Sequence, residues 1–395
     1  MIAKKIKETI ESPSAGVIRK MFEEGAVLKQ KYGEDNVFDF SIGNPDLDPP
    51  EKVLNAIKEV SLDETHMCHG YMPNAGYKQT REAMAKKTSI EQGVNVDWES
   101  IVMAVGAAGA INCVMKTLLN PGDEVIVPCP YFTEYDHYIH NHGGEIKRVS
   151  TKEDFSLDID EIKKALSPKT AAILINSPNN PSGKIYSDED ITALAAVLRE
   201  EGNKNGRLPY IICDEPYRAI TYNGKKVAAV FPKYKNSVVV TSFAKNLSVP
   251  GERIGYIAVN PECEDGKSFV QACIFATRVL GFVNAPAFFQ KVIAKSWDSE
   301  CDYSLYDKRC KEIMSVMDYA GLKYAKPEGA FYLFVKVPDK WNDDDMAFVN
   351  HLKSFNILCA PGSGFGGKGW FRISYCVAEK TILNSKEAFY KAVHS

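Results

Sequence analysis

None of the ten cysteines belongs to a C-x-x-C pair, and the sequence has no H-E-x-x-H motif. It also has no G-x-G-x-x-G motif after an early strand. These absences argue against zinc ribbons, thiol redox motifs, zinc peptidases and nicotinamide-binding folds, and they predict no metal site. Cys129, Cys213 and Cys359 lie within apolar runs, where a free thiol behaves as a small hydrophobe. This pattern is typical of a reduced, cytoplasmic protein.

No charge of either sign dominates the chain, whose formal net charge is -3 at pH 7. Such a balance gives no general attraction to nucleic acid or to an anionic membrane. No apolar run reaches the roughly 18 residues of a membrane-spanning helix. The first residues, MIAKKIKETIESPS, are charged and lack the apolar centre of a secretory signal. We therefore expect small-molecule partners, with no nucleic acid and no membrane.

Length and hydrophobic patterning predict two or three domains, with an α/β domain in the middle of the chain. The chain has 395 residues, and domains usually hold about 100–200. Its strand candidates are continuous apolar runs, as expected for strands buried on both faces of a mostly parallel sheet. Helical patterns such as AGAINCVMKTLL lie between them. The strand candidates span residues 100–105, 123–128, 171–177, 210–215 and 237–243.

The last third of the sequence has a different character. Residues 284–324 are helical in pattern and rich in charge. GAFYLFVKV and GWFRISYCV then alternate in the manner of half-exposed strands, which predicts a second, smaller α+β domain. The glycine-rich segment 361–369 lacks the G-x-x-x-x-G-K-[ST] order and leads into a strand. We interpret it as a loop and not as a nucleotide-binding turn.

Small and polar residues follow the ends of successive apolar runs, which is where ligands bind in open α/β sheets. Ala107 and Ala108 open a helix whose free N–H groups favour a phosphate. Asn180 lies in a rigid PNNPSG loop, Asp214 ends one strand, and Lys245 follows another. Each feature alone has an ordinary explanation: a tight turn, a plain loop, a capping carboxylate, or a lysine that reaches solvent.

The joint occurrence of these residues fits a site for pyridoxal phosphate. That cofactor needs a lysine for a Schiff base, an acid for the ring nitrogen, donors for the ring hydroxyl, and positive charge with N–H groups for the phosphate. A lysine in a water-poor site has a lowered pKa, which suits Schiff-base chemistry. Ser242 and Arg253 flank the lysine, so that a hydroxyl and a positive charge accompany it.

Four motifs, NSPNNPSG, DEPY, SFAKNLSVPGERIGY and FRIS, resemble those of the fold-type I pyridoxal-phosphate enzymes, specifically the class I aminotransferases. The resemblance runs from residue 40 to residue 375. It implies an α/β fold with a mostly parallel central sheet in a large domain, residues 46–285. Residues 1–45 and 286–395 would form a discontinuous small domain. The implied roles are Lys245 as the Schiff-base lysine and proton carrier, Asp214 on the ring nitrogen, Asn180 and Tyr217 on the ring hydroxyl, Phe132 on the ring face, and Ser242, Arg253, Ala107 and Ala108 on the phosphate. Gly251 and Gly255 would let the loop between Lys245 and Arg253 wrap back beneath that phosphate.

The same resemblance implies how substrates bind and how chains assemble. Arg372 would bind the substrate α-carboxylate, with Gly43 and Asn180 beside it. Tyr71 would reach the phosphate of the neighbouring subunit, which implies a homodimer with shared active sites. Ala108 stands where one aspartate-aminotransferase subgroup carries a lysine for the substrate side chain. A neutral or aromatic amino acid is therefore an open alternative to aspartate.

Transamination from an L-amino acid to a 2-oxo acid such as 2-oxoglutarate is the leading hypothesis. A β-eliminating C–S lyase on the same fold is the nearest alternative, because the residues that form the carbanion are shared. Release of ammonia without an amino acceptor would favour the lyase. A non-catalytic cofactor-binding regulator is a third alternative. Since the resemblance begins by about residue 40, we expect no added DNA-binding domain and an enzyme instead.

Overall fold

The computed structural model describes residues 2–11 and 17–395. The part of the predicted small domain that falls on Met1 and residues 12–16 lies outside the described residues. The largest sheet has seven strands, and four of its neighbouring pairs are parallel, which confirms a mostly parallel sheet. The strand 255–259 runs antiparallel to both of its neighbours. The spatial order is β2 (Ile101–Ala104), β8 (Gly255–Val259), β7 (Ser237–Ser242), β6 (Tyr210–Asp214), β5 (Thr170–Asn176), β3 (Glu124–Cys129) and β4 (Glu145–Ser150).

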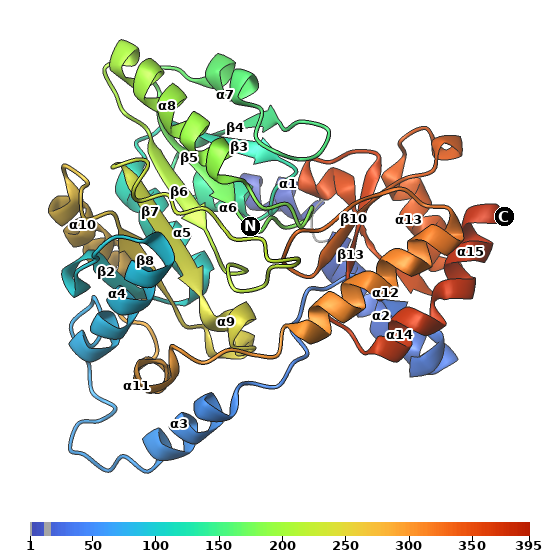
Figure 1. Cartoon of the computed structure of the whole chain (residues 1–395), viewed down its shortest axis with the longest axis horizontal. Helices are drawn as coiled ribbons and strands as arrows, with labels where there is room; N and C mark the ends of the chain where they lie inside the picture. Colours follow the sequence, from blue (N-terminus) through green and yellow to red (C-terminus); the bar gives the residue numbers. More distant parts are fainter. Residues whose placement is uncertain (1, 12–16) are drawn as a thin grey trace.

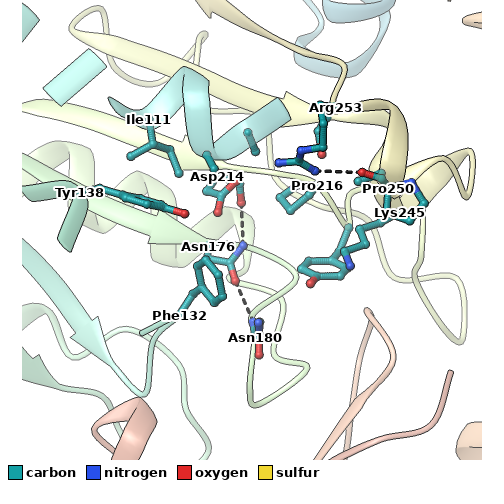
Figure 2. A pocket seen from close by; sticks show the side chains of 15 residues that line it. Ile111, Phe132, Tyr138, Asn176, Asn180, Asp214, Pro216, Lys245, Pro250 and Arg253 are labelled. Atoms are coloured by element: carbon teal, nitrogen blue, oxygen red, sulfur yellow. Dashed lines mark hydrogen bonds between the residues drawn. The ribbon is translucent and has the colours of Figure 1, made fainter. Parts of the chain in front are cut away.

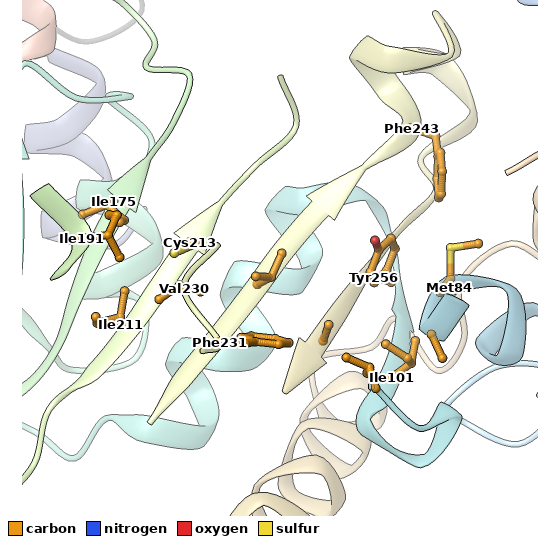
Figure 3. Close-up of a cluster of buried hydrophobic side chains, with 14 of the residues drawn as sticks. Met84, Ile101, Ile175, Ile191, Ile211, Cys213, Val230, Phe231, Phe243 and Tyr256 are labelled. Carbon is orange, nitrogen blue, oxygen red and sulfur yellow. The ribbon is translucent and has the colours of Figure 1, made fainter. Parts of the chain in front are cut away.

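Helices cover the two faces of this sheet and enclose two apolar cores (Figure 1). One core lies between the sheet and α5 (Gly106–Leu118), α6 (Tyr135–His140) and α10 (Gly266–Val279). The other core, part of which Figure 3 shows, contains side chains from the opposite sheet face, the ring of Phe243 just after β7, and side chains from five longer helices. These are α3 (Glu51–Ser61), α4 (Lys78–Gln92), α7 (Ile159–Ala165), α8 (Asp188–Asn205) and α11 (Ala287–Ser296).

The ends of α8 show how local sequence sets an element. The Ser187 side chain accepts a hydrogen bond from the Asp190 backbone N–H, and the Asp190 side chain accepts one from the Ser187 N–H. This reciprocal pair satisfies free donors at the start of the helix. The helix ends at Gly206, whose φ of 72° lies in the left-handed region that glycine adopts without a Cβ penalty.

A second region gathers the C-terminal third around a four-stranded antiparallel sheet (Figure 1). Its strands lie in the order β12 (Ala360–Pro361), β13 (Trp370–Ser374), β10 (Tyr332–Lys336) and β9 (Tyr324–Ala325). A parallel pair, β1 (Phe38–Asp39) and β11 (Ile357–Leu358), joins the N-terminal segment to this region. The remaining helices are α1 (Lys4–Glu11), α2 (Val17–Tyr32), α9 (Phe243–Asn246), α12 (Ser304–Ala320), α13 (Asp345–Lys353), α14 (Glu379–Asn384) and α15 (Lys386–His394), with 3-10 turns η1 (Glu34–Asn36), η2 (Trp98–Ser100), η3 (Pro250–Glu252), η4 (Asp339–Trp341) and η5 (Gly362–Phe365).

The prediction of half-exposed strands in this second region is wrong. β10 and β13 are buried along their length except at Lys336 and Trp370. One face of these strands belongs to the core of the second region. The other face meets residues of the large-sheet region: the rings of Phe334 and Phe155 lie 5.7 Å apart, and Arg372 contacts Asn180. The alternation in the sequence therefore marks two different buried environments and not exposure to water.

The segment 361–369 forms a loop in this second region, as predicted, with η5 at its start. The buried carboxylate of Asp345, at the start of α13, anchors it. Asp345 accepts hydrogen bonds from the backbone N–H groups of Ser363, at 2.7 Å, and Gly369, at 3.4 Å. No helix within residues 2–11 and 17–395 is long and apolar enough to cross a membrane.

Candidate active site

A cavity of about 240 Å³ lies at the carboxyl ends of β5, β6 and β7, beside the start of α5. In Figure 2, Asp214 and Asn176 occupy its centre, with Lys245 and Arg253 on one side and Phe132 and Tyr138 on the other. Nearly all the residues predicted to bind the cofactor line this one cavity. They are Ala107, Ala108, Phe132, Asn180, Asp214, Tyr217, Ser242, Lys245 and Arg253, and they are joined by Ile111, Tyr138, Asn176, Pro216, Ala244 and Pro250.

Three predicted site residues do not line the cavity itself. The carbonyl oxygen of Gly43 accepts a hydrogen bond from the Lys245 amine at 2.7 Å. Arg372 donates to the side-chain oxygen of Asn180, a lining residue, at 3.0 Å. Both therefore lie directly beside the cavity. Tyr71 is 94% exposed and does not line the cavity of its own chain.

Asp214 is the buried acid of the site and the last residue of β6. Burial raises the pKa of its carboxyl to about 7, although a hydrogen bond from the Tyr135 hydroxyl at 2.5 Å opposes that rise. Its second carboxylate oxygen, Oδ1, has no hydrogen-bond partner among the described residues. A buried carboxylate oxygen without a partner is costly, so this atom fits a ligand that donates a hydrogen bond or carries positive charge.

Lys245 lies in α9, one short turn beyond the end of β7, and is half-buried. Removal from water lowers the pKa of its amine to about 8, and the nearby charges of Arg372 and Arg253 act in the same direction. The hydrogen bond to Gly43 and the ring of Phe331, 5.5 Å away, hold the amine beside the cavity. A substantial fraction of neutral amine at physiological pH suits this lysine to attack a carbonyl carbon.

The opposite end of the cavity is built to bind an anion. Ala107 and Ala108 lie in the first turn of α5, whose free N–H groups and helix dipole favour negative charge. The Arg253 guanidinium reaches this turn and donates to the Pro250 carbonyl at 3.0 Å. Gly106 permits the approach: its φ is 66°, and a Cβ there would lie 2.9 Å from Arg253 Nη2.

The two glycines assigned to the loop after Lys245 differ in what surrounds them. A Cβ on Gly255 would collide with the Thr241 carbonyl oxygen and lie 2.9 Å from the carbonyl carbon of Gly106. A Cβ on Gly251 would meet nothing within 4 Å. The expectation for Gly251 is therefore wrong, because neither a close contact nor a positive φ requires glycine there. At Gly255, close packing against Thr241 of β7 and Gly106, the first residue of α5, does require glycine.

Arg372 is held rigidly, as expected for an arginine that must face polar groups within a buried strand. Its Nη1 and Nη2 donate to Asn180 Oδ1 and to the Ser41 carbonyl, at 3.0 and 2.7 Å. The rings of Tyr332 and Phe365 lie on the guanidinium at 4.6 and 4.7 Å. Its buried Nε has no partner among the described residues and so remains available to an incoming acceptor.

Four polar residues of the site were not predicted from the sequence. Tyr138 and Asn176 line the cavity, and Asn176 also accepts from the Asn180 N–H at 2.7 Å. Tyr135 donates to Asp214, and the Tyr332 hydroxyl lies 2.8 Å from that of Tyr217. Asn176, the last residue of β5, could have been found at its strand end. The other three are tyrosines whose contacts reach distant parts of the chain, and no local pattern marks them.

The cavity offers what pyridoxal phosphate requires. A half-buried amine and a partnerless carboxylate oxygen face one space, beside an aromatic ring, amide and phenol donors, and an anion site. The Asn180 side-chain oxygen is occupied by Arg372, so its NH₂ group remains free to donate. Fold and site therefore define a fold-type I enzyme that depends on pyridoxal phosphate.

Comparison with known proteins gives the family. Residues 35–388 match the model of aminotransferase class I and II, and the chain belongs to that family. A probable aspartate aminotransferase of Methanocaldococcus jannaschii is 32% identical, covering 88% of this chain and 92% of its own. Aromatic-amino-acid aminotransferase 2 of Thermococcus litoralis is 29% identical, over 98% of each chain.

Solved structures agree with this assignment. The crystal structure of an amino transferase from Eubacterium rectale superposes with a TM-score of 0.94 at 37% identity, covering 99% of this chain and 98% of that one. Thermus thermophilus aspartate aminotransferase with maleate gives a TM-score of 0.85 at 25% identity, over 99% of each chain. The protein is thus a pyridoxal-phosphate-dependent aminotransferase, and the comparisons do not favour the lyase alternative.

Proposed function

We propose that this aminotransferase holds its cofactor through Lys245 and transfers the α-amino group of an L-amino acid to a 2-oxo acid, with 2-oxoglutarate as the acceptor. The observation that carries the proposal is the pairing of a half-buried amine and a buried carboxyl group in one cavity. The Lys245 amine has its pKa lowered to about 8, and Asp214 keeps one carboxylate oxygen without a partner among the described residues. The amine is suited to bond with a carbonyl carbon, and the carboxylate oxygen is suited to accept a hydrogen bond from a protonated ring nitrogen.

The remaining lining residues would hold the other parts of the cofactor. Asn180 and Tyr217 would donate to the ring hydroxyl, and Phe132 would cover one ring face. Ser242, Arg253 and the N–H groups of Ala107 and Ala108 would bind the phosphate. When bound, pyridoxal phosphate supplies an electron sink for the pair of electrons left at Cα when its proton departs.

Lys245 would also carry that proton. Its amine would take the proton from the substrate Cα and hold it at Nζ until the proton is returned, because the lowered pKa leaves a useful neutral fraction. The Gly43 carbonyl, 2.7 Å from the amine, would keep the side chain close to the cavity between these transfers.

Arg372 would bind the α-carboxylate of both the amino acid and the oxo acid. Its partners leave Nε free within the described structure, and two aromatic rings fix the plane of the guanidinium. Ala108 brings no charge to the cavity, which supports a neutral or aromatic donor. The relatives include enzymes named for aromatic amino acids and for aspartate, so both donor classes belong in the test.

We further propose a homodimer in which Tyr71 completes the phosphate site of the other subunit. The 94% exposure of this phenol on its own chain supports the idea. Met67 and Leu62, at 69% and 79%, are exposed apolar residues of the same segment. We also propose a cytoplasmic location, which the ten unpaired cysteines support.

For most of the chain we propose the domains that the sequence predicts. Residues 46–285 form the large domain, and residues 1–45 and 286–395 form the small domain. Separate apolar cores in the two regions support this division. Phe289, Val292 and Ile293 of α11 belong to a core of the large sheet. We therefore propose that the second boundary lies after α11, beyond Ser296.

Absorption spectroscopy of the purified protein tests the proposed reaction. Amino acids added one at a time, without oxo acid, should convert the cofactor spectrum to that of pyridoxamine phosphate for the donor class only. Lys245→Ala should slow this conversion by at least about a hundredfold, the usual contribution of a positioned acid–base group. Lys226→Ala, on an exposed loop, is the control.

Two results would contradict the proposal. The absence of a cofactor band after addition of pyridoxal phosphate would remove its basis. Release of ammonia and 2-oxo acid without storage of the amine on the cofactor would point back to the lyase.

A further inference from the structure

The tyrosine that would donate to the cofactor ring hydroxyl, Tyr217, is itself hydrogen-bonded to a second buried tyrosine. The hydroxyls of Tyr217 and Tyr332 lie 2.8 Å apart, and their rings meet edge to face at 5.6 Å. Tyr332 belongs to β10 and is 2% exposed. It does not line the cavity, whereas Tyr217 does.

The space around the Tyr332 hydroxyl is closed by Gly43. A Cβ at that position would collide with the Tyr332 oxygen. Gly43 is also the residue whose carbonyl accepts from the Lys245 amine. The absence of a side chain at Gly43 therefore leaves room for the Tyr332 hydroxyl beside the residue that binds the Lys245 amine.

Proton counting gives this hydrogen bond a direction. Each phenol has one proton to donate and can accept from others. Among the described residues, Tyr332 has no hydroxyl partner besides Tyr217. If Tyr217 donated, the buried Tyr332 proton would be left without an acceptor, which is costly. If Tyr332 donates, the Tyr217 proton is free to point into the cavity.

We propose that Tyr332 is a positioning residue that donates to Tyr217 and thereby aims the Tyr217 proton at the cofactor ring oxygen. The inference rests on the proposed role of Tyr217. A donor into the Tyr217 oxygen also polarises its O–H bond and strengthens the hydrogen bond that it makes. Tyr332 would thus act on the cofactor through Tyr217 and would not contact the cofactor itself.

Tyr332 has a second contact, which the test must separate from the first. Its ring lies 4.6 Å from the Arg372 guanidinium. Phenylalanine keeps that ring and removes only the hydroxyl, so Tyr332→Phe isolates the hydrogen bond. The other charged or titratable groups that act on the tyrosine pair are Asp214 and Cys376, and the variant leaves both in place.

The experiment is a spectroscopic pH titration of the cofactor-bound enzyme without substrate. A hydrogen bond to the ring oxygen stabilises negative charge there and lowers the apparent pKa of the visible absorption change. Tyr332→Phe should therefore raise that pKa by about 0.2–0.5 unit. Tyr217→Phe should raise it further, and adding Tyr332→Phe to Tyr217→Phe should have no additional effect, because Tyr332 acts through that hydroxyl.

A matched control is Tyr375→Phe. It removes the hydrogen bond of another buried tyrosine pair, in which the Tyr375 hydroxyl donates to the Tyr222 hydroxyl at 3.1 Å. Neither of these tyrosines lines the cavity. This control should leave the spectroscopic pKa unchanged. If Tyr332→Phe binds cofactor too weakly to titrate, 3-fluorotyrosine at position 332 replaces it. This stronger donor should lower the pKa.

Three results would overturn the proposal. The first is an unchanged spectroscopic pKa in Tyr332→Phe. The second is that Tyr332→Phe shifts this pKa as much in the Tyr217→Phe background as in the wild type, and the third is that Tyr375→Phe shifts it as much as Tyr332→Phe does. Failure of the proposed function is a different outcome, since the wild-type enzyme would then show no lysine-dependent cofactor band at all.

Discussion

The amine of Lys245 owes its chemistry to its surroundings. Burial disfavours the ammonium form, so its pKa is lowered to about 8. We predict that an amine-selective acylating reagent will label Lys245 of the cofactor-free protein with a half-maximal rate near pH 8, because only the neutral amine reacts. Peptide mass spectrometry across pH 6–11 measures the profile. Solvent-exposed lysines, with a pKa near 10.4, provide the internal reference. A Lys245 profile that coincides with theirs would contradict the prediction.

Tyr135 is the only hydrogen-bond donor to the Asp214 carboxylate within the described structure. We predict that Tyr135→Phe will weaken cofactor binding by about ten- to a hundredfold, the usual effect of removing one hydrogen bond to a charged group. Equilibrium titration with pyridoxal phosphate measures the dissociation constant. Tyr138→Phe is the matched control, because Tyr138 lines the same cavity without a hydrogen bond to Asp214. Equal losses in the two variants would show that the bond to Asp214 is not responsible.

The segment from β7 through α9 and η3 to β8 sets the distance between the two ends of the site. β7 ends at Ser242, and Lys245 follows in α9, so both residues lie at the carboxyl end of this strand. η3 turns the chain back through Arg253, whose φ of 51° lies in the left-handed region. β8 then returns antiparallel beside β7. One hairpin-like unit therefore carries both the proposed cofactor lysine and the proposed phosphate arginine.

The two glycines of this unit make a paired prediction. Gly255→Ala should lower the free energy of unfolding by about 1–3 kcal/mol, because its methyl group would overpack the backbone of Thr241 and Gly106. Gly251→Ala should be neutral or stabilising by up to about 1 kcal/mol, since nothing lies within 4 Å. Urea denaturation of both variants beside the wild type measures the difference. Equal effects would mean that the packing at Gly255 is not limiting.

The loop 361–369 illustrates how an element without catalytic groups serves the site. Asp345 binds its backbone at Ser363 and Gly369. The loop in turn places the ring of Phe365 on one face of Arg372, while Tyr332 of β10 contacts the guanidinium from its own strand. A glycine-rich stretch that suggests a nucleotide site in isolation thus supports the arginine proposed to bind the substrate carboxylate.

At the level of the assembled molecule, the proposed homodimer predicts complementation between inactive subunits. Tyr71→Ala should lose about ten- to a hundredfold in activity, the effect of one charged hydrogen bond, and Lys245→Ala should be inactive. A mixed dimer of the two variants contains one site with both residues intact. Co-expression at equal levels should therefore restore about a quarter of wild-type activity, because half of the dimers are mixed and each has one complete site. Activity no higher than the mean of the separate variants would contradict a shared site.

Five of the buried strands, the residues that follow several of them and the family could be predicted from the sequence. Lys245, Asp214 and Asn180 follow continuous apolar runs, and such runs are local properties of the chain. Parallel strands bring their carboxyl ends to one edge, so the residues that follow them meet in one cavity. Two strands of the large sheet were not predicted. The edge strand β4, EIKRVS, is too polar to resemble a buried run. The strand β8, GYIAV, is an apolar run that was not recognised as a strand, although the structure buries all of it.

Contacts between distant parts of the chain were decided only in the folded structure. Tyr332 meets Tyr217 across 115 residues, and Lys245 meets Gly43 across 202. Such pairs depend on which faces of the two regions come together, and no periodicity in the sequence records that. The same docking buries both faces of β10 and β13. Burial of Lys245 and Asp214 in the folded chain shifts their pKa values in opposite directions. Local sequence supplies the reactive groups, and tertiary burial sets their protonation, because desolvation depends on everything packed around a charge.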